Sequence, residues 1–248
     1  MTIVSEADWL GMKAVGQVVH LTLKAVEKAV REGVRTSELD ELASAIFAQH
    51  GARSAPALTY DFPGTILISV NNEIVHGIPG DDLLHAGDVV KIDVTAEKDG
   101  YIADAARTVI VGEGTTTAQK LKQCVEQAFA AAMAVTKVGT PVNEIGRAIW
   151  NEVRRHGFQV IPHLTGHGVG RAIHEEPTVP NFYNKRQRDI LTEGLVLAVE
   201  PIVCAGNGKV FTDDDGWTIC TQDQSLAAHY ENTIVVTQDG PVILTAAS

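Results

Sequence analysis

The sequence contains little cysteine, and its charge is strongly one-sided. Its three cysteines are Cys124, Cys204 and Cys220, and no two of them have Cys-x-x-Cys spacing. This odd number favours reduced cysteines in a cytosolic protein over a disulfide framework. The formal net charge is −11, which argues against nucleic acid or an anionic membrane as the main partner, because both select positive surfaces. Buried carboxylates that hold metal would also raise the negative count.

Long hydrophobic runs are absent too. The first sixteen residues, MTIVSEADWLGMKAVG, contain no basic segment followed by an apolar one, so no signal peptide is expected. No apolar run approaches the roughly 18 residues that span a bilayer. With 248 residues, 45 % hydrophobic and 21 % charged, the composition is that of a soluble globular protein. We therefore expect a cytoplasmic protein.

The apolar spacing predicts four helices, each followed by a glycine that can end it. The second and fourth belong to a weak internal repeat, in which residues 33–51 align without gaps with residues 139–157 at an offset of 106. In the fourth, Pro141 suits the first helical position. The expected helices are 5–32, 37–50, 117–138 and 141–156.

Runs typical of strands follow each pair of helices. Helices at the start and strands at the end of each half indicate an α+β fold, in which helices back a largely antiparallel sheet. We expect one domain, 1–248, with halves of about 1–112 and 113–248. The expected strands are 65–70, 88–97, 101–111, 195–204, 216–220 and 231–237.

The first hairpin predicts a pair of carboxylates. Asp99-Gly100 is a strong two-residue turn signal. With that turn, Asp93 lies opposite residue 106 and Asp104 lies opposite Thr95, so both aspartates point to one face. Aspartate is a poor strand former, and two carboxylates on one side repel each other unless a positive group lies between them. A solvated face is the alternative interpretation.

Three more residues extend this acidic pattern. Glu200 interrupts the apolar run 195–204, and Glu231 opens the run 231–237. His167 lies among glycines in 165–177, seven residues before His174, which is not the four-residue spacing of a metalloprotease helix. Four carboxylates would balance two divalent ions. Oxygen-rich ligation with one imidazole suits Mn²⁺, Fe²⁺, Co²⁺ or Zn²⁺ in an open catalytic site.

With these residues gathered, the sequence resembles type I methionine aminopeptidases of the M24 metallopeptidases, which have the pita-bread fold. The similarity covers nearly the whole chain in order. It lies in SVNNEIVHGIP (69–79), KIDVTAEKDGYIADAARTVIVG (91–112), TGHGVGRAIHEEP (165–177), AVEPIV (198–203), DGWT (215–218) and SLAAHYENTIVVT (225–237).

The resemblance implies a two-metal aminopeptidase that removes the initiator methionine from nascent chains whose second residue is small. A hydroxide that bridges the metals would attack the scissile carbonyl. Glu200 would transfer a proton, and His174 and His76 would act next to the substrate. The implied metal ligands are Asp93, Asp104, His167, Glu200 and Glu231.

The resemblance also implies an apolar pocket for the methionine side chain, with ordinary core packing as the alternative for its members. Many relatives have phenylalanine where Ile173 stands, and they differ in 58–64, so the pocket shape departs from the family pattern. The candidates are Tyr60, Phe62, Ile173 and Trp217.

Two alternatives stay open: a pita-bread peptidase that acts on Xaa-Pro peptides, and a docking protein that has lost catalysis. The first usually carries a large N-terminal domain, and the second should lack a ligand. We expect a monomer that acts on nascent N-termini near the ribosome exit, without nucleic acid or membrane partners.

Overall fold

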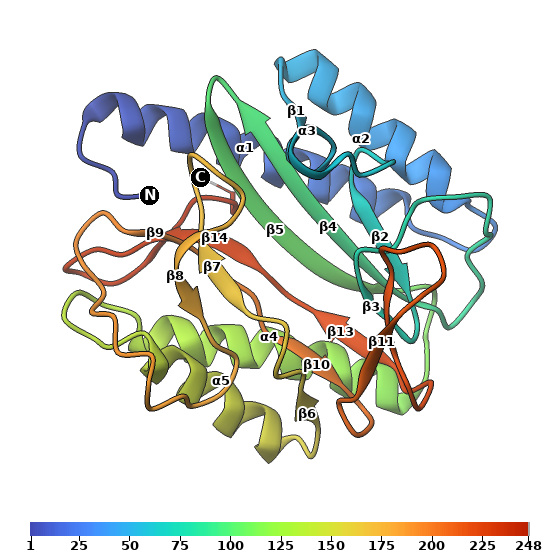
Figure 1. Ribbon diagram of the computed structural model, residues 1–248. Coiled ribbons are helices and arrows are strands. Elements are labelled where there is room, and N and C mark those ends of the chain that lie inside the picture. Colours follow the sequence, from blue (N-terminus) through green and yellow to red (C-terminus); the bar gives the residue numbers. More distant parts are fainter. Residues whose placement is uncertain (248) are drawn as a thin grey trace.

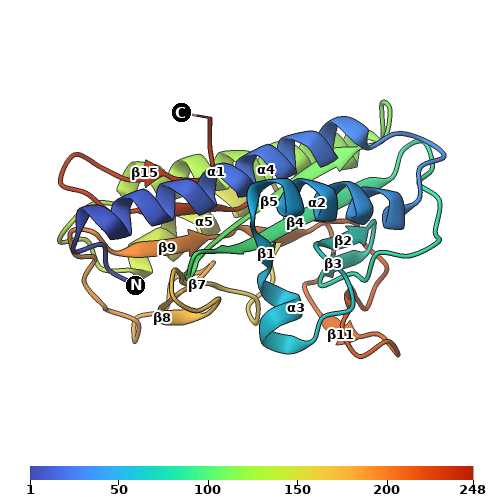
Figure 2. The same ribbon diagram turned by 90° about the horizontal axis from the view of Figure 1, so that it is seen from above.

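The computed structural model describes residues 1–247, in which helices cover one face of the strands. In Figure 2 the long helices lie on one side of the strand layer and the short helix α3 lies on the other. The long helices are α1 (Glu6–Ala29), α2 (Thr36–His50), α4 (Thr116–Val135) and α5 (Asn143–Arg155), and the short one is α3 (Ala55–Tyr60).

The four predicted helices are confirmed to within a few residues because their caps are local. Ser5 Oγ accepts a hydrogen bond from the Asp8 amide at the start of α1, and Gly51 closes α2 with a φ of +62°. The prediction that Pro141 occupies the first position of the fourth helix is wrong, since α5 begins at Asn143 and Val142 is its N-cap. No helix within residues 1–247 is long and apolar enough to cross a membrane.

The central hairpin consists of β4 (Val89–Lys98) and β5 (Tyr101–Ile110), drawn in green in Figure 1. Both turn residues have positive φ, +51° at Asp99 and +81° at Gly100, as the predicted turn requires. Asp93 pairs with Ala106 and Thr95 pairs with Asp104. The predicted register is therefore confirmed, and both aspartates point to the same face.

The remaining strands are short, and every strand pairing within residues 1–247 is antiparallel. Besides the hairpin they are β1 (Arg53–Ser54), β2 (Leu67–Val70), β3 (Glu73–Val75), β6 (Gln159–Val160), β7 (Gly166–Gly168), β8 (Glu175–Val179), β9 (Val196–Val199), β10 (Ile202–Cys204), β11 (Val210–Thr212), β12 (Ile219–Thr221), β13 (Ala227–His229), β14 (Asn232–Val235) and β15 (Val242–Ile243).

The prediction of one continuous strand over 195–204 is wrong. β9 pairs with β14 and β7, whereas β10 pairs with β13 and β6. Glu200 and Pro201 form the break between them, because proline has no N–H to donate to a ladder. The break releases Glu200 from the alternation of a regular strand and places its side chain between two sheets.

Two apolar clusters anchor the strands to the helices. One includes Val19 of α1 and Ile92 of β4, and the other includes Leu121 of α4 and Leu197 of β9, all at most 2 % exposed. The repeat is visible in the glycines that flank α2 and α5, since Gly33 and Gly139 have φ values of +80° and +87°. The assignment of 1–248 to one domain stays a prediction.

Candidate functional site

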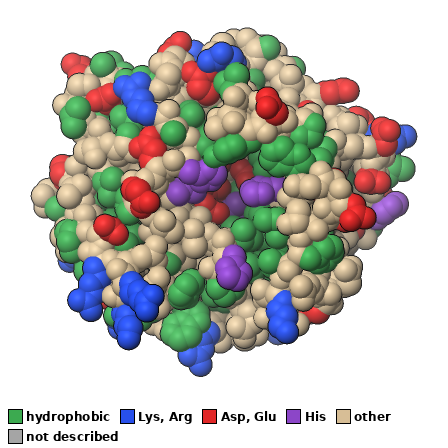
Figure 3. All heavy atoms as spheres, viewed as in Figure 1, with side chains coloured by type: hydrophobic (Ala, Val, Ile, Leu, Met, Phe, Trp, Pro, Cys, Tyr) green, Lys and Arg blue, Asp and Glu red, His purple; other side chains and the backbone are tan. Residues whose placement is uncertain are grey.

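The face of the strands opposite the long helices is hollowed at its centre, where histidine side chains ring buried acidic groups (Figure 3). The cavity has a volume of about 670 Å³. All the side chains selected from the sequence line it, although they come from seven separate segments of the chain. They are Tyr60, Phe62, His76, Asp93, Asp104, His167, Ile173, His174, Glu200, Trp217 and Glu231.

The hairpin supplies Asp93 and Asp104 to the cavity floor. Thr95 Oγ1 donates to Asp104 Oδ1 at 2.8 Å. The Asp104 amide donates to Thr233 Oγ1, and the Thr233 hydroxyl donates to the Asp104 carbonyl, each at 2.8 Å. The two bonds to Thr233 tie the Asp104 backbone in β5 to β14, and the bond from Thr95 orients the Asp104 carboxylate.

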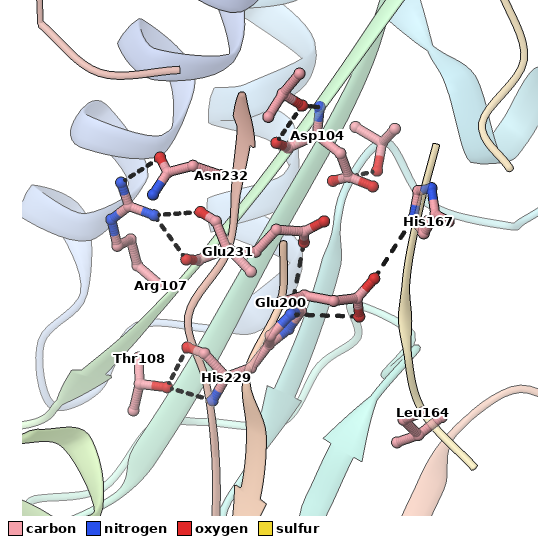
Figure 4. A network of polar contacts seen from close by, with 12 residues as sticks. Asp104, Arg107, Thr108, Leu164, His167, Glu200, His229, Glu231 and Asn232 are labelled. Atoms are coloured by element: carbon pink, nitrogen blue, oxygen red, sulfur yellow. Dashed lines mark hydrogen bonds and ion pairs between the residues drawn. The ribbon is translucent and has the colours of Figure 1, made fainter. Parts of the chain in front are cut away.

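Glu231 is held from the side by Arg107. The guanidinium donates to the Glu231 carbonyl at 2.6 Å and to Asn232 Oδ1 at 2.9 Å, and it stacks 4.1 Å above the ring centroid of Tyr230. Figure 4 shows the Glu231 carboxylate turned from this anchor towards Asp104 and Glu200. Arg107 therefore fixes the backbone without neutralising the carboxylate in the cavity.

His167 completes the group from β7. Its Nδ1 lies 2.9 Å from the Gly168 carbonyl oxygen, so Nδ1–H donates and the lone pair is on Nε2. Nε2 lies 3.5 Å from Glu200 Oε1. Burial, then the neighbouring His174, lower the pKa of His167 to about 4. The imidazole is thus neutral at pH 7 and able to bind a metal.

The four carboxylates lie too close together for all of them to be charged without a cation. Burial raises the pKa of Asp104 to about 6. Burial and the neighbouring Asp104 raise the pKa of Asp93, Glu200 and Glu231 well above the usual carboxyl range. Asp93 Oδ1 and Glu231 Oε1 are buried with no hydrogen-bond partner among residues 1–247. Such orphaned oxygens are the expected ligands of divalent ions.

Two sets of side chains have the spacing of metal ligands. Donor atoms of Asp104, His167 and Glu231 lie within 4.8 Å of one another, as do those of Asp93, His229 and Glu231. Glu200 stands outside both sets, yet its two oxygens lie 3.5 Å from His167 Nε2 and 3.8 Å from His229 Nε2. The residues fit divalent ions on two sides of the shared Glu231.

His229 was missed in the sequence. It is 1 % exposed and lines the same cavity, and burial, then the neighbouring His76, lower its pKa to about 3. The available signal was its position two residues before Glu231, because residues i and i+2 of an extended chain point to the same side.

The rim of the cavity carries two more histidines. The Tyr60 hydroxyl lies 2.6 Å from His174 Nδ1, and the rings of His167 and His174 meet edge to face at 4.4 Å. His76 has a φ of +63°, which is uncommon for a residue other than glycine. Burial, then the neighbouring His174, lower the pKa of His76, and burial lowers the pKa of His174, so both rim imidazoles are neutral at pH 7.

One wall of the cavity is apolar. The rings of Phe62 and Trp217 meet edge to face at 5.2 Å and 85°. Phe62 and Ile173 are each 4 % exposed, whereas Tyr60 is 44 % exposed. Phe62, Ile173 and Trp217 can enclose an apolar side chain next to the acidic cluster, and Tyr60 stands at the mouth with its hydroxyl on His174.

Known proteins are similar to this chain over most of its length. Residues 11–238 match metallopeptidase family M24. The chain belongs to this family. It is 40 % identical to methionine aminopeptidase 2 of Bacillus subtilis over 247 residues, which cover 99 % of each chain. It is 41 % identical to a methionine aminopeptidase of Clostridium perfringens over 234 residues, which cover 94 % of each.

Solved structures match this chain over nearly its full length. A methionine aminopeptidase from Rickettsia prowazekii matches with a TM-score of 0.94 at 37 % identity, over 99 % of this chain and 100 % of that one. A prolidase from Pyrococcus furiosus matches with a TM-score of 0.80 at 21 % identity, over all of this chain and 66 % of that one, which shows a shared fold alone. The predicted family and pita-bread fold are confirmed.

Proposed function

We propose that this chain is a metal-dependent aminopeptidase that removes N-terminal methionine from polypeptides whose second residue is small. The observation that carries the proposal is the cavity itself, in which four carboxylates and the His167 imidazole adjoin an apolar wall; Asp104 and Glu231 are buried, and Asp93 and Glu200 are half-buried. Full-length similarity to methionine aminopeptidases supports the same reaction.

The metal ligands in this proposal are Asp93, Asp104, His167, Glu200 and Glu231. Their neutral imidazole and orphaned carboxylate oxygens suit Mn²⁺, Fe²⁺, Co²⁺ or Zn²⁺. Two such ions, when bound, supply Lewis acidity and lower the pKa of a water molecule towards about 7. Four carboxylates match the charge of two divalent ions, which would also give Asp93 Oδ1 and Glu231 Oε1 the partner they lack in the protein.

Glu200 and His174 have separate roles in catalysis. Glu200 lies in the break between β9 and β10 with its carboxylate in the cavity, where it takes a proton from water and delivers it to the leaving amine. In this proposal the Tyr60 hydroxyl, 2.6 Å from His174 Nδ1, is the donor of that hydrogen bond, which leaves the His174 proton on Nε2. That Nε2–H donates to the substrate carbonyl oxygen as negative charge develops there. His76 is a second donor at the rim.

The methionine side chain lies against Phe62, Ile173 and Trp217, with Tyr60 at the edge. The edge-to-face pair of Phe62 and Trp217 gives the pocket a fixed wall. A flexible thioether fills such a pocket by dispersion and by sulfur–aromatic contact. The substrates are N-termini of nascent polypeptides, on which the enzyme acts as a monomer near the ribosome exit.

The experiment is a panel of peptides offered to metal-free protein supplemented with Mn²⁺, Fe²⁺, Co²⁺ or Zn²⁺ in turn. Met-Ala-Ser, a leucine-first tripeptide and a Xaa-Pro peptide are compared by chromatography of the released amino acid. Metal-dependent release of methionine alone is expected. Release from the Xaa-Pro peptide in place of Met-Ala-Ser would assign the chain to the proline-specific branch, and no release by metal-loaded protein would favour a docking role.

A further inference from the structure

His229 has a fixed position and an unexplained side chain. Its amide donates to Thr108 Oγ1 at 2.9 Å, and the Thr108 hydroxyl donates to the His229 carbonyl at 2.8 Å. These two bonds clamp the last residue of β13 to the central hairpin. The imidazole then extends towards Glu200 and Glu231 (Figure 4).

The imidazole has no hydrogen bond to account for its burial. Neither Nδ1 nor Nε2 has a hydrogen-bond partner within the described part of the chain. The nearest oxygens to Nε2 are Glu231 Oε2 at 3.5 Å and Glu200 Oε2 at 3.8 Å. Both distances exceed the roughly 2.7–3.2 Å of an N–H···O hydrogen bond. A buried polar group without a partner is costly, so an additional group is expected between these atoms.

These distances suit donors that share a metal ion. Two donors about 2.1 Å from one ion lie roughly 3–3.4 Å apart. The pair His167 Nε2 and Glu200 Oε1, both proposed ligands, has the same 3.5 Å separation as His229 Nε2 and Glu231 Oε2. The distance from the His229 imidazole to the Glu231 carboxylate is therefore the same as that from the His167 imidazole to the Glu200 carboxylate.

We propose that His229 is a sixth metal ligand, whose imidazole joins Asp93 and Glu231 on one ion while His167 serves the other. Ligand atoms of Asp93, His229 and Glu231 lie within 4.8 Å of one another, and Glu231 belongs to both sets. The inference rests on the proposed function, because His229 can be a metal ligand only if the cavity binds divalent ions.

One imidazole on each ion has a consequence for metal choice. Imidazole favours Zn²⁺, Co²⁺ and Fe²⁺, whereas an all-carboxylate site suits Mn²⁺ and Mg²⁺. Without His229, the ion held by Asp93 would have oxygen ligands only from this set. His229→Gln should therefore weaken Co²⁺ binding at that site much more than Mn²⁺ binding.

The test counts coordinated imidazoles without using activity. Metal-free protein is loaded with two equivalents of Co²⁺, and hyperfine-shifted, solvent-exchangeable imidazole N–H signals are recorded by proton NMR. Two signals are expected. His229→Gln should remove one and His167→Gln the other, whereas exposed His85→Gln should keep both. The number of imidazole N–H signals in the wild-type protein tests the inference even if a variant does not fold.

Calorimetry separates a ligand from a residue that only orients one. We expect His229→Gln to lower the binding affinity for one of the two Co²⁺ ions by more than about 100-fold. Loss of a residue that only orients a ligand typically lowers metal affinity by about 10–100-fold. A single imidazole signal in protein that binds two Co²⁺ ions would overturn the inference and leave the proposed function intact. Failure to bind Co²⁺ at all would overturn both.

Discussion

The hydroxyl of Tyr60 lies 2.6 Å from Nδ1 of His174. This contact joins the end of α3 to the segment between β7 and β8. The two residues that make it are 114 positions apart in the chain. With the hydroxyl as donor, as proposed above, His174 carries its proton on Nε2. Tyr60 was selected from the sequence as a pocket residue, and the structure gives its hydroxyl a second task.

Tyr60→Phe should lower kcat for Met-Ala-Ser by about fivefold to tenfold, which corresponds to the roughly 1 kcal/mol of one hydrogen bond. The phenyl ring keeps the apolar surface, so KM should change little. Steady-state kinetics check this. A change confined to KM would show that Tyr60 acts through the pocket alone.

The two neighbouring histidines should respond differently to removal. His174→Ala should lower kcat by about 100-fold or more, as loss of an oxyanion donor does, while metal content measured by atomic emission stays at the wild-type level. His167→Ala should lose metal together with activity. Loss of metal from the His174 variant would show that the two roles have been exchanged.

The apolar wall should control substrate affinity. Trp217→Ala removes the partner of Phe62, so KM for Met-Ala-Ser should rise about tenfold, within the roughly 1–3 kcal/mol that a hydrophobic pocket contributes to selectivity. Co²⁺ affinity measured by calorimetry should not change. Unchanged KM would mean that methionine binds elsewhere in the cavity.

The Asp104 pKa predicts a pH-dependent stability difference in metal-free protein. Burial raises the pKa from an ordinary 3.8 to about 6, so the folded state holds a proton that the unfolded state releases. The contribution of Asp104 to stability is therefore present below its unfolded pKa and is lost as pH rises through about 6. The buried imidazoles of His167 and His229 have lowered pKa values and oppose this trend. The pH dependence of wild-type stability therefore does not by itself isolate the contribution of Asp104.

A matched variant isolates the carboxylate. Asp104→Asn keeps the shape and cannot ionise, so its Tm relative to wild type should rise between pH 4 and pH 7 and then level off. Differential scanning calorimetry in the presence of chelator measures this difference. A constant difference across that range would show that Asp104 is not held in a raised-pKa environment.

Much of the site could be predicted because its signals are local. Asp99-Gly100 determines the hairpin register, and the register determines that Asp93 and Asp104 share a face. Glycine, proline and apolar spacing likewise predict the helices and the α+β class. Motif order along the chain was sufficient to recognise the family, since it depends on residue identities alone.

Other features depend on tertiary contacts that no local pattern contains. Glu200 lies in the break between β9 and β10, which pair with strands of different sheets. The continuous apolar run in the sequence does not show which strand each of them pairs with. His229 is buried against Glu231 by its clamp to Thr108 across 121 residues. Its position two residues before Glu231 indicates a shared side of the chain, but it does not show that the imidazole is buried.

The most direct test of the central claim is a metal titration of metal-free protein with Met-Ala-Ser as substrate, run in parallel on wild type, Asp104→Ala and the exposed control Asp239→Ala. We expect methionine release by wild type and Asp239→Ala to rise with added Co²⁺ and to saturate as the cavity fills. Asp104→Ala should stay folded by circular dichroism and lose activity by orders of magnitude. Near-wild-type release by metal-loaded Asp104→Ala would contradict the assignment of this cavity as the catalytic centre.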